Sequence, residues 1–122
     1  MADNSSKTKN HHSDSDDRVF KAKKYVEDNF DIFFSCQEVA AYCRISEKQL
    51  GRLFIKHENK GLLEFIHEKK LEMIKMLLLR KNITHTLVAE QLGFSSAQYY
   101  GKFVRRMTGM TPEEYKNHIT NS

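Results

Sequence analysis

Apolar residues recur at the spacing of an α-helix along most of this chain. A first apolar stripe predicts a helix from about Asp17 to Asn29, with lysines on its other face. It consists of Val19, Phe20, Tyr25, Val26 and Phe30. No segment alternates apolar and polar residues as a strand does, and the chain has only five glycines and one proline. The pattern therefore predicts an all-α fold.

Four Ser or Thr residues stand where a capping box would begin a helix. In such a box the hydroxyl accepts a hydrogen bond from the amide three residues later, and a Glu or Gln at that position accepts one from the cap amide. The four pairs are Ser35 with Glu38, Ser46 with Gln49, Ser95 with Gln98, and Thr111 with Glu114. Pro112 follows Thr111 at the first helical position, where its missing N–H costs nothing. These pairs support helix starts ahead of four apolar stretches.

The sequence also contains an internal repeat. Residues 39–46 correspond to residues 88–95 at an offset of 49, and residues 50–65 correspond to residues 100–115 at an offset of 50. One inserted residue near the start of the second copy's longer helix explains the change of offset. Agreement over about 27 positions predicts one supersecondary unit built twice.

Each copy has the pattern of a short helix, a tight turn and a longer helix, which is the order of a helix-turn-helix. The expected helices are 37–43 and 47–58 in the first copy, and 87–92 and 96–108 in the second. Gly93 suits a turn with positive φ. Its counterpart Arg44 does not, so the first turn is either strained or different in shape.

On the longer helix of each copy the apolar residues mark a buried face and leave a basic face outward. The expected inward residues are Leu50, Leu53, Phe54 and His57 in the first copy, and Tyr100, Phe103, Val104 and Met107 in the second. The outward residues are Lys48, Gly51, Arg52, Ile55 and Lys56, and then Ala97, Gln98, Gly101, Lys102, Arg105 and Arg106. Glu47 is the one acidic residue near either face. Such faces suit the phosphate-lined major groove of DNA.

The basic charge of these faces and the glycines on them both have a plainer interpretation. A basic helix face is often only a solvated surface, but two of them at matched positions of a repeat favour binding. Gly51 and Gly101 each cost about 1 kcal/mol relative to Ala in a helix. Close approach of the backbone to a partner would explain that cost, whereas the alternative is that both are surface positions without a role.

Residues 61–81 separate the two copies and are predicted to form a linker helix. As one helix, residues 62–80 would extend roughly 28 Å at about 1.5 Å per residue. That length is close to the roughly 34 Å between successive major-groove faces of DNA. The sequence therefore predicts a first helix-turn-helix subdomain at 17–60 and a second at 82–122, which contact successive grooves of one duplex.

Composition limits the remaining possibilities. The 122 residues suffice for one or two small helical cores, and a net charge of +4 is modest. Residues 1–16 are polar and are predicted to be a disordered tail.

Cys36 and Cys43 would lie about 10 Å apart on a helix, beyond disulfide reach, which is typical of a reducing cytosol. Without a signal peptide or a long apolar run, the expected location is the cytoplasm, with no membrane partner.

Nothing in the sequence predicts an enzyme. The six histidines are scattered, and neither an H-x-x-x-H nor a C-x-x-C spacing occurs, so no catalytic residue, metal ligand or cofactor is expected. The alternative to DNA binding is a helical module that uses the same basic faces for a protein or for RNA. RNA recognition normally needs exposed aromatic residues, whereas Tyr100 and Phe103 fall on the inward face and only Tyr99 falls outward.

Two segments resemble the DNA-binding domain of the AraC/XylS family of bacterial regulators. Residues 87–116, LVAEQLGFSSAQYYGKFVRRMTGMTPEEYK, resemble the family's Gly-Phe turn, aromatic recognition helix and closing G-x-T-P-x-x-Y, and residues 38–58 resemble its first unit. The similarity covers about residues 17–119. The sequence departs from the family pattern at Ile74, His85 and Val104.

The resemblance implies a domain of about seven helices, with two helix-turn-helix subdomains joined by a long helix. It further implies a transcription activator that binds double-stranded DNA and contacts RNA polymerase, although no sensing domain is visible in this chain. By motif position, Lys48, Gly51 and Arg52 match base-reading sites in the first unit, and Gln98, Gly101 and Lys102 match those in the second. Phosphate contacts are expected from Ser46, Lys56, Ser95, Ser96, Arg105 and Arg106.

Overall fold

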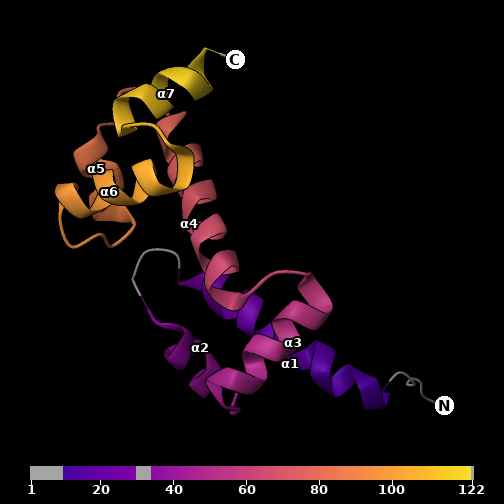
Figure 1. The fold of residues 1–122 in the computed structure, drawn as a ribbon. Helices are drawn as coiled ribbons and strands as arrows, with labels where there is room; N and C mark the ends of the chain where they lie inside the picture. The colour runs from indigo at the N-terminus through magenta and orange to yellow at the C-terminus, as the bar shows by residue number, and fades with distance from the viewer. Residues whose placement is uncertain (1–9, 30–33, 122) are drawn as a thin grey trace. The chain divides into compact units, whose positions relative to one another are not determined.

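The computed structural model describes residues 10–29 and 34–121, and within them it contains seven helices and no strand (Figure 1). The helices are α1 (Asn10–Asp28), α2 (Cys36–Tyr42), α3 (Glu47–Glu58), α4 (Leu62–Leu78), α5 (His85–Gln91), α6 (Ala97–Thr108) and α7 (Pro112–Thr120). The predicted all-α fold with about seven helices is confirmed. The chain divides into two compact units, and the boundary falls within α4 after Phe65.

The start of α1 differs from the sequence prediction. The helix begins at Asn10 rather than near Asp17, within the polar segment 1–16 that the sequence assigns to a tail, and residues 1–9 lie outside the described part. Residues 10–16 carry no apolar stripe, and periodicity therefore could not reveal them. Farther along α1, Val19 and Val26 are buried as expected, but Phe20 is 62% exposed, and Phe30 lies outside the described residues.

The first unit packs α1 against α2 and α3, with the start of α4 closing the core. Its buried side chains are Val19, Ala22, Val26, Val39, Ala40, Cys43, Leu50, Phe54, Leu62 and Phe65. The rings of Phe54 and Phe65 lie 5.4 Å apart, which ties α3 to the first turn of α4. Both cysteines are free, and Cys43 is buried while Cys36 is half-buried.

The second unit has a continuous core built from α4, α5, α6 and α7. Its buried members are Ile74, Leu77, Leu78, Ile83, Val88, Ala89, Leu92, Phe94, Tyr100, Phe103, Val104 and Tyr115. Ile74 and Val104, two of the departures from the family pattern, are completely buried. α4 is the long helix that the sequence predicted between the two helix-turn-helix units, and it contributes core residues to both.

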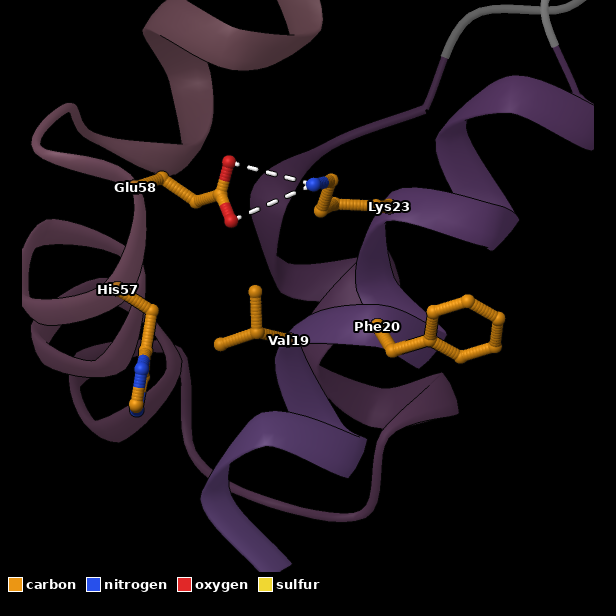
Figure 2. A pocket seen from close by; sticks show the side chains of 5 residues that line it. All are labelled: Val19, Phe20, Lys23, His57 and Glu58. Carbon is orange, nitrogen blue, oxygen red and sulfur yellow. Dashed lines mark hydrogen bonds and ion pairs between the residues drawn. The ribbon is translucent and has the colours of Figure 1, made fainter. Parts of the chain in front are cut away.

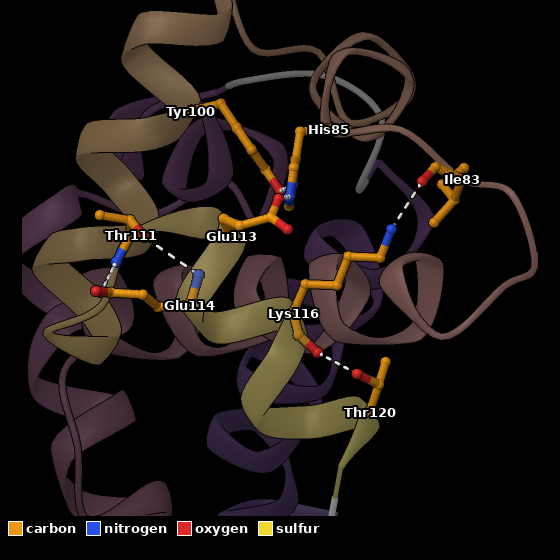
Figure 3. A network of polar contacts seen from close by, with 8 residues as sticks. All are labelled: Ile83, His85, Tyr100, Thr111, Glu113, Glu114, Lys116 and Thr120. Carbon is orange, nitrogen blue, oxygen red and sulfur yellow. Dashed lines mark hydrogen bonds and ion pairs between the residues drawn. The ribbon is translucent and has the colours of Figure 1, made fainter.

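A polar network covers one side of the second unit (Figure 3). His85, the third departure, shares a 2.9 Å hydrogen bond through Nδ1 with the hydroxyl of Tyr100. Its Nε2 lies 3.4 Å from the Glu113 carboxylate without hydrogen-bond geometry. Lys116 donates to the carbonyl of Ile83 at 3.1 Å and so fastens α7 to the segment before α5. A polar His85 is therefore accommodated by partners from α6 and α7.

Three of the four predicted capping boxes are confirmed. Both hydrogen bonds of the box are present at Ser35 with Glu38, Ser46 with Gln49, and Thr111 with Glu114. The fourth is wrong, because Ser96 rather than Ser95 caps α6 and accepts a hydrogen bond from the amide of Tyr99. Ser96 follows Ser46 by 50 residues, so the inserted residue of the second copy is in the turn before the cap.

The short helix α5 also begins earlier than expected, at His85 instead of Leu87. Its cap is Thr84, whose hydroxyl accepts a hydrogen bond from the Leu87 amide. Residue 87 is not Glu or Gln, so no second hydrogen bond completes a box and the sequence offered no pair to recognise.

The turns of the two helix-turn-helix units have the same shape. Arg44 and Gly93 both adopt left-handed backbone conformations, with φ of 63° and 78°. After each, the next amide donates to the carbonyl five residues back, from Ile45 to Ala40 at 3.2 Å and from Phe94 to Ala89 at 2.9 Å. Of the two possibilities for the first turn, the structure therefore shows backbone strain at Arg44 rather than a different turn.

Candidate nucleic-acid interface

The exposed face of α3 carries three cations. Lys48, Arg52 and Lys56 are all exposed, while Leu50 and Phe54 on the opposite side are completely buried. The ends of the helix are fixed by the capping box at its start and by a left-handed cap at Asn59. α3 is therefore a rigid support that points its cations away from the core.

Three other side chains of α3 follow the predicted faces only in part. His57 was expected on the inward face, but it is exposed, and Leu53 is only half-buried. Ile55 was expected outward and is 60% exposed among the cations. Sequence reasoning gave Ile55 no role, because a single apolar residue on a basic face leaves no charge or motif signal.

The exposed face of α6 repeats this arrangement. Gln98, Lys102, Arg105 and Arg106 are exposed together with Ala97. The inward side chains Tyr100, Phe103 and Val104 are buried as predicted, and Met107 is half-buried. Gly109 ends α6 with a left-handed cap, as Asn59 ends α3 fifty residues earlier. Both helices of the repeat thus present a cationic face.

The cations on these faces are not neutralised by ion pairs within residues 10–29 and 34–121. In the described part of the chain, no carboxylate forms an ion pair with any of the six cations. They are Lys48, Arg52 and Lys56 on α3, and Lys102, Arg105 and Arg106 on α6. Lysines elsewhere do, as in the pair of Lys23 with Glu58 at 3.3 Å. Uncompensated cations on a fixed surface raise the local positive potential and attract an anionic partner.

The charge of Arg106 also acts within the second unit. Burial lowers the pKa of His67, and the nearby positive charge of Arg106 lowers it further. The imidazole packs edge-on against the ring of Phe103, with ring centroids 5.4 Å apart. His67 therefore tends to stay neutral beneath the cationic face of α6.

The three candidate serines lie near the starts of the two exposed helices. The hydroxyls of Ser46 and Ser96 accept hydrogen bonds from amides of α3 and α6. Ser95 is exposed in the turn. The first turn of a helix carries partial positive charge from its unpaired amides, so these positions complement the cations farther along each helix.

The two helical glycines are not required by packing within the chain. A Cβ built at Gly51 would meet nothing within 4 Å, and one at Gly101 would meet only Pro112 Cγ at 4.0 Å, an ordinary contact. Neither residue has a positive φ. The fold would therefore accept alanine at both positions, so packing among the described residues gives no reason for glycine there.

A pocket lies beside α3, on the side that faces α1 (Figure 2). It is lined by Val19, Phe20, Lys23, His57 and Glu58. Figure 2 shows Lys23 and Glu58 pointing toward each other across it, and their ion pair occupies its polar side. In the described part of the chain, no three His, Cys, Asp or Glu residues gather as a metal site would need. None of its helices combines the length and apolar character that a membrane span requires.

Comparison with known proteins gives a consistent result. A family model described as a helix-turn-helix domain matches residues 39–118. An uncharacterized HTH-type transcriptional regulator of Escherichia coli K12 is 28% identical over 91 residues, which are 75% of this chain and 32% of that protein. One from Staphylococcus aureus is 31% identical over 101 residues, 83% of this chain and 14% of its own length. The chain thus spans a third or less of these relatives.

Solved structures share the fold. The C-terminal domain of AraT, a response regulator from Geobacillus stearothermophilus, has a TM-score of 0.75 at 20% identity, over 83% of this chain and 84% of that one. The DNA-binding domain of the transcriptional factor AdpA, solved in complex with a target DNA, has a TM-score of 0.72 at 19% identity, over 83% and 91%. At such identities the likeness establishes the helical architecture.

Proposed function

We propose that this chain, which belongs to the AraC-type helix-turn-helix family, regulates transcription by binding double-stranded DNA in two successive major grooves. The observation that carries the proposal is the pair of cationic faces on α3 and α6, which occupy matched positions of a repeated unit and lack ion pairs among the described residues. DNA has a high density of phosphate charge, and exposed Lys and Arg replace its counterions. Relatives named as transcriptional regulators support the regulatory role.

The candidate residues divide into two roles on this proposal. Base edges are read by Lys48, Gly51 and Arg52 on α3, and by Gln98, Gly101 and Lys102 on α6. Phosphates are bound by Lys56, Arg105 and Arg106, with Ser46, Ser95 and Ser96 near the helix starts. Arg can bind guanine through two hydrogen bonds and Gln can do so with adenine, whereas phosphate contacts position the protein without reading sequence.

The test is a mobility shift with the purified chain on a duplex enriched from a random pool, measured from 50 to 200 mM salt. If the six cations replace counterions, log affinity should fall linearly with log salt, with a slope of roughly −0.9 per phosphate contact. An affinity that does not change with salt, or a pool from which no duplex is enriched, would contradict the proposal.

Single-stranded and duplex RNA of the same length test the alternative partner class. RNA recognition by stacking needs exposed aromatic rings. On α6 Tyr100 and Phe103 are only 1% and 5% exposed, whereas Tyr99 is 50% exposed. Equal or tighter binding to RNA would favour the RNA-binding alternative over the DNA-binding proposal.

Activation of transcription through RNA polymerase is the finer part of the proposal, and it rests on the family resemblance. The chain spans a third or less of the two relatives, and a separate sensing domain with an effector belongs to the proposal as well. In vitro transcription from a promoter that carries the enriched site would test activation directly. Reduced transcript yield on addition of the protein would indicate a repressor instead.

A further inference from the structure

Ile55 is an apolar residue in the middle of a cationic surface. It is 60% exposed on α3, where it lies three residues after Arg52 and four after Gly51. Residues at these spacings are neighbours on one helix face, with Cβ atoms about 5 to 6 Å apart. Ile55 therefore belongs to the surface that would enter the groove, beside the candidate base-reading residues.

The neighbours of Ile55 explain why this residue is more than an ordinary exposed side chain. Single exposed apolar residues are common on protein surfaces. Here, however, the cations Lys48, Arg52 and Lys56 are exposed on the same outward face, and an apolar protein partner would have to desolvate them. The partner that suits the cations is DNA, and the apolar group that DNA displays in its major groove is the C5 methyl of thymine.

Gly51 makes a close approach to that methyl possible. One turn before Ile55, it leaves open space where a Cβ would stand, with nothing within 4 Å. At the corresponding place in the second unit, fifty residues later, Ile55 is replaced by the exposed Arg105. The two units are therefore chemically different at this position, and only the first presents an aliphatic side chain there.

We infer that Ile55 is a specificity-determining residue that contacts the C5 methyl group of a thymine in the half-site bound by α3. The inference rests on the proposed DNA binding and adds an apolar contact to it. Burial of one methyl-sized group is worth about 0.8 kcal/mol, which corresponds to a roughly fourfold change in affinity. The first unit thus reads a thymine next to the base pair that Arg52 contacts.

Deoxyuridine provides the test, because it removes only the C5 methyl and leaves the hydrogen-bonding groups of thymidine intact. The probe is a duplex enriched by this protein from a random pool, resynthesised with one thymidine at a time replaced by deoxyuridine. At one or two positions the wild-type chain should lose about fourfold in affinity. Ile55→Ala should bind the thymidine duplex about fourfold more weakly and show no further loss at those positions.

Two further variants make the result specific. Leu63→Ala removes another exposed leucine-sized side chain, 54% exposed at the start of α4 and off the face of α3, and should keep the full deoxyuridine penalty. Ile55→Arg copies the second unit, so it should bind with a steeper salt dependence while losing the penalty. Retained binding in this variant shows that the lost penalty does not reflect unfolding.

The outcomes separate this inference from the proposed function. A pool without any enriched duplex counts against DNA binding itself. An enriched duplex that contains no thymine, or deoxyuridine penalties that are the same in the wild type and in Ile55→Ala, overturns the role of Ile55 and leaves DNA binding intact.

Discussion

Arg44 and Gly93 occupy the same left-handed position in two copies of one turn, with φ of 63° and 78°. The hydrogen bonds that close the turn are the same in both copies. The side chain at this position therefore does not decide the shape of the turn, which is imposed by the packing of the helices on either side. The conformation costs an L-residue roughly 1 to 2 kcal/mol, but costs glycine almost nothing.

Substitutions in the two turns should accordingly have opposite effects. Arg44→Gly should raise the free energy of unfolding by up to about 1 kcal/mol, since relief of strain exceeds the added entropy of the unfolded chain. Gly93→Ala should lower it by about 1 to 2 kcal/mol. Urea unfolding followed by circular dichroism measures both. Asn59→Gly serves as control, because Asn tolerates its φ of 61° and a smaller gain is expected.

Gly51→Ala should affect stability and binding in opposite directions. The new methyl meets nothing within 4 Å, so better helix propensity should stabilise the fold by up to about 1 kcal/mol. If the backbone approaches a DNA base at this point, the same methyl should weaken binding several-fold. Gly61→Ala adds a methyl that also meets nothing, but outside α3, and should leave DNA affinity unchanged. Unchanged affinity in Gly51→Ala would support a surface glycine without a role.

Arg52 and Lys56 should differ in what their removal does to base preference. Arg52→Ala is expected to cost roughly 1 to 3 kcal/mol on the enriched site and to flatten the preference at one or two base pairs, as for loss of a bidentate guanine contact. Lys56→Ala should weaken binding to all sequences alike and reduce the salt slope by about 1. Competition with single-base variants of the site distinguishes the two. Preserved preference in Arg52→Ala would remove Arg52 from the base-reading set.

The free energy of unfolding should depend on pH through His67. Burial, with the charge of Arg106 as a second cause, lowers its pKa below the ordinary value of 6.5. Between the lowered pKa and 6.5 the unfolded chain binds more protons than the folded one, so stability is lost as pH falls below about 6.5. His67→Phe keeps the ring contact with Phe103 and removes the titration. Its unfolding midpoint should change less than that of the wild type between pH 7.5 and 5.

The sequence predicted best those parts of the fold whose signal lies within a few consecutive residues. The boxes at Ser46 and Thr111 and the buried faces of α3 and α6 follow from local hydrogen bonding and helical spacing. The wrong cap at Ser95 shows the limit, because two serines in succession offered the same hydroxyl. The backbone conformation selected Ser96, with φ of −159° and ψ of 159°.

Other features depended on contacts distant in sequence. Phe20 fits the apolar stripe of α1 but is exposed, since Val19, Ala22 and Val26 already fill the side that faces α2 and α3. His85 could not be placed from its neighbours in sequence, because its partners Tyr100 and Glu113 come from α6 and α7. The roles of the candidate site residues are proposals for a related reason. The bases and phosphates that these residues would contact are not part of the chain.

The side chain of Lys70 limits where the chain can be divided. It is 4% exposed on α4, donates a 3.1 Å hydrogen bond to the carbonyl of Leu92 in the turn before α6, and lies 6.0 Å from the centre of the Phe94 ring. A fragment that began at Thr84 would contain the whole second helix-turn-helix motif, yet it would lose this amine and the α4 residues Ile74, Leu77 and Leu78. A fragment of the second half should therefore begin upstream of Lys70, because the helix-turn-helix motif is shorter than the stretch of chain that builds its core.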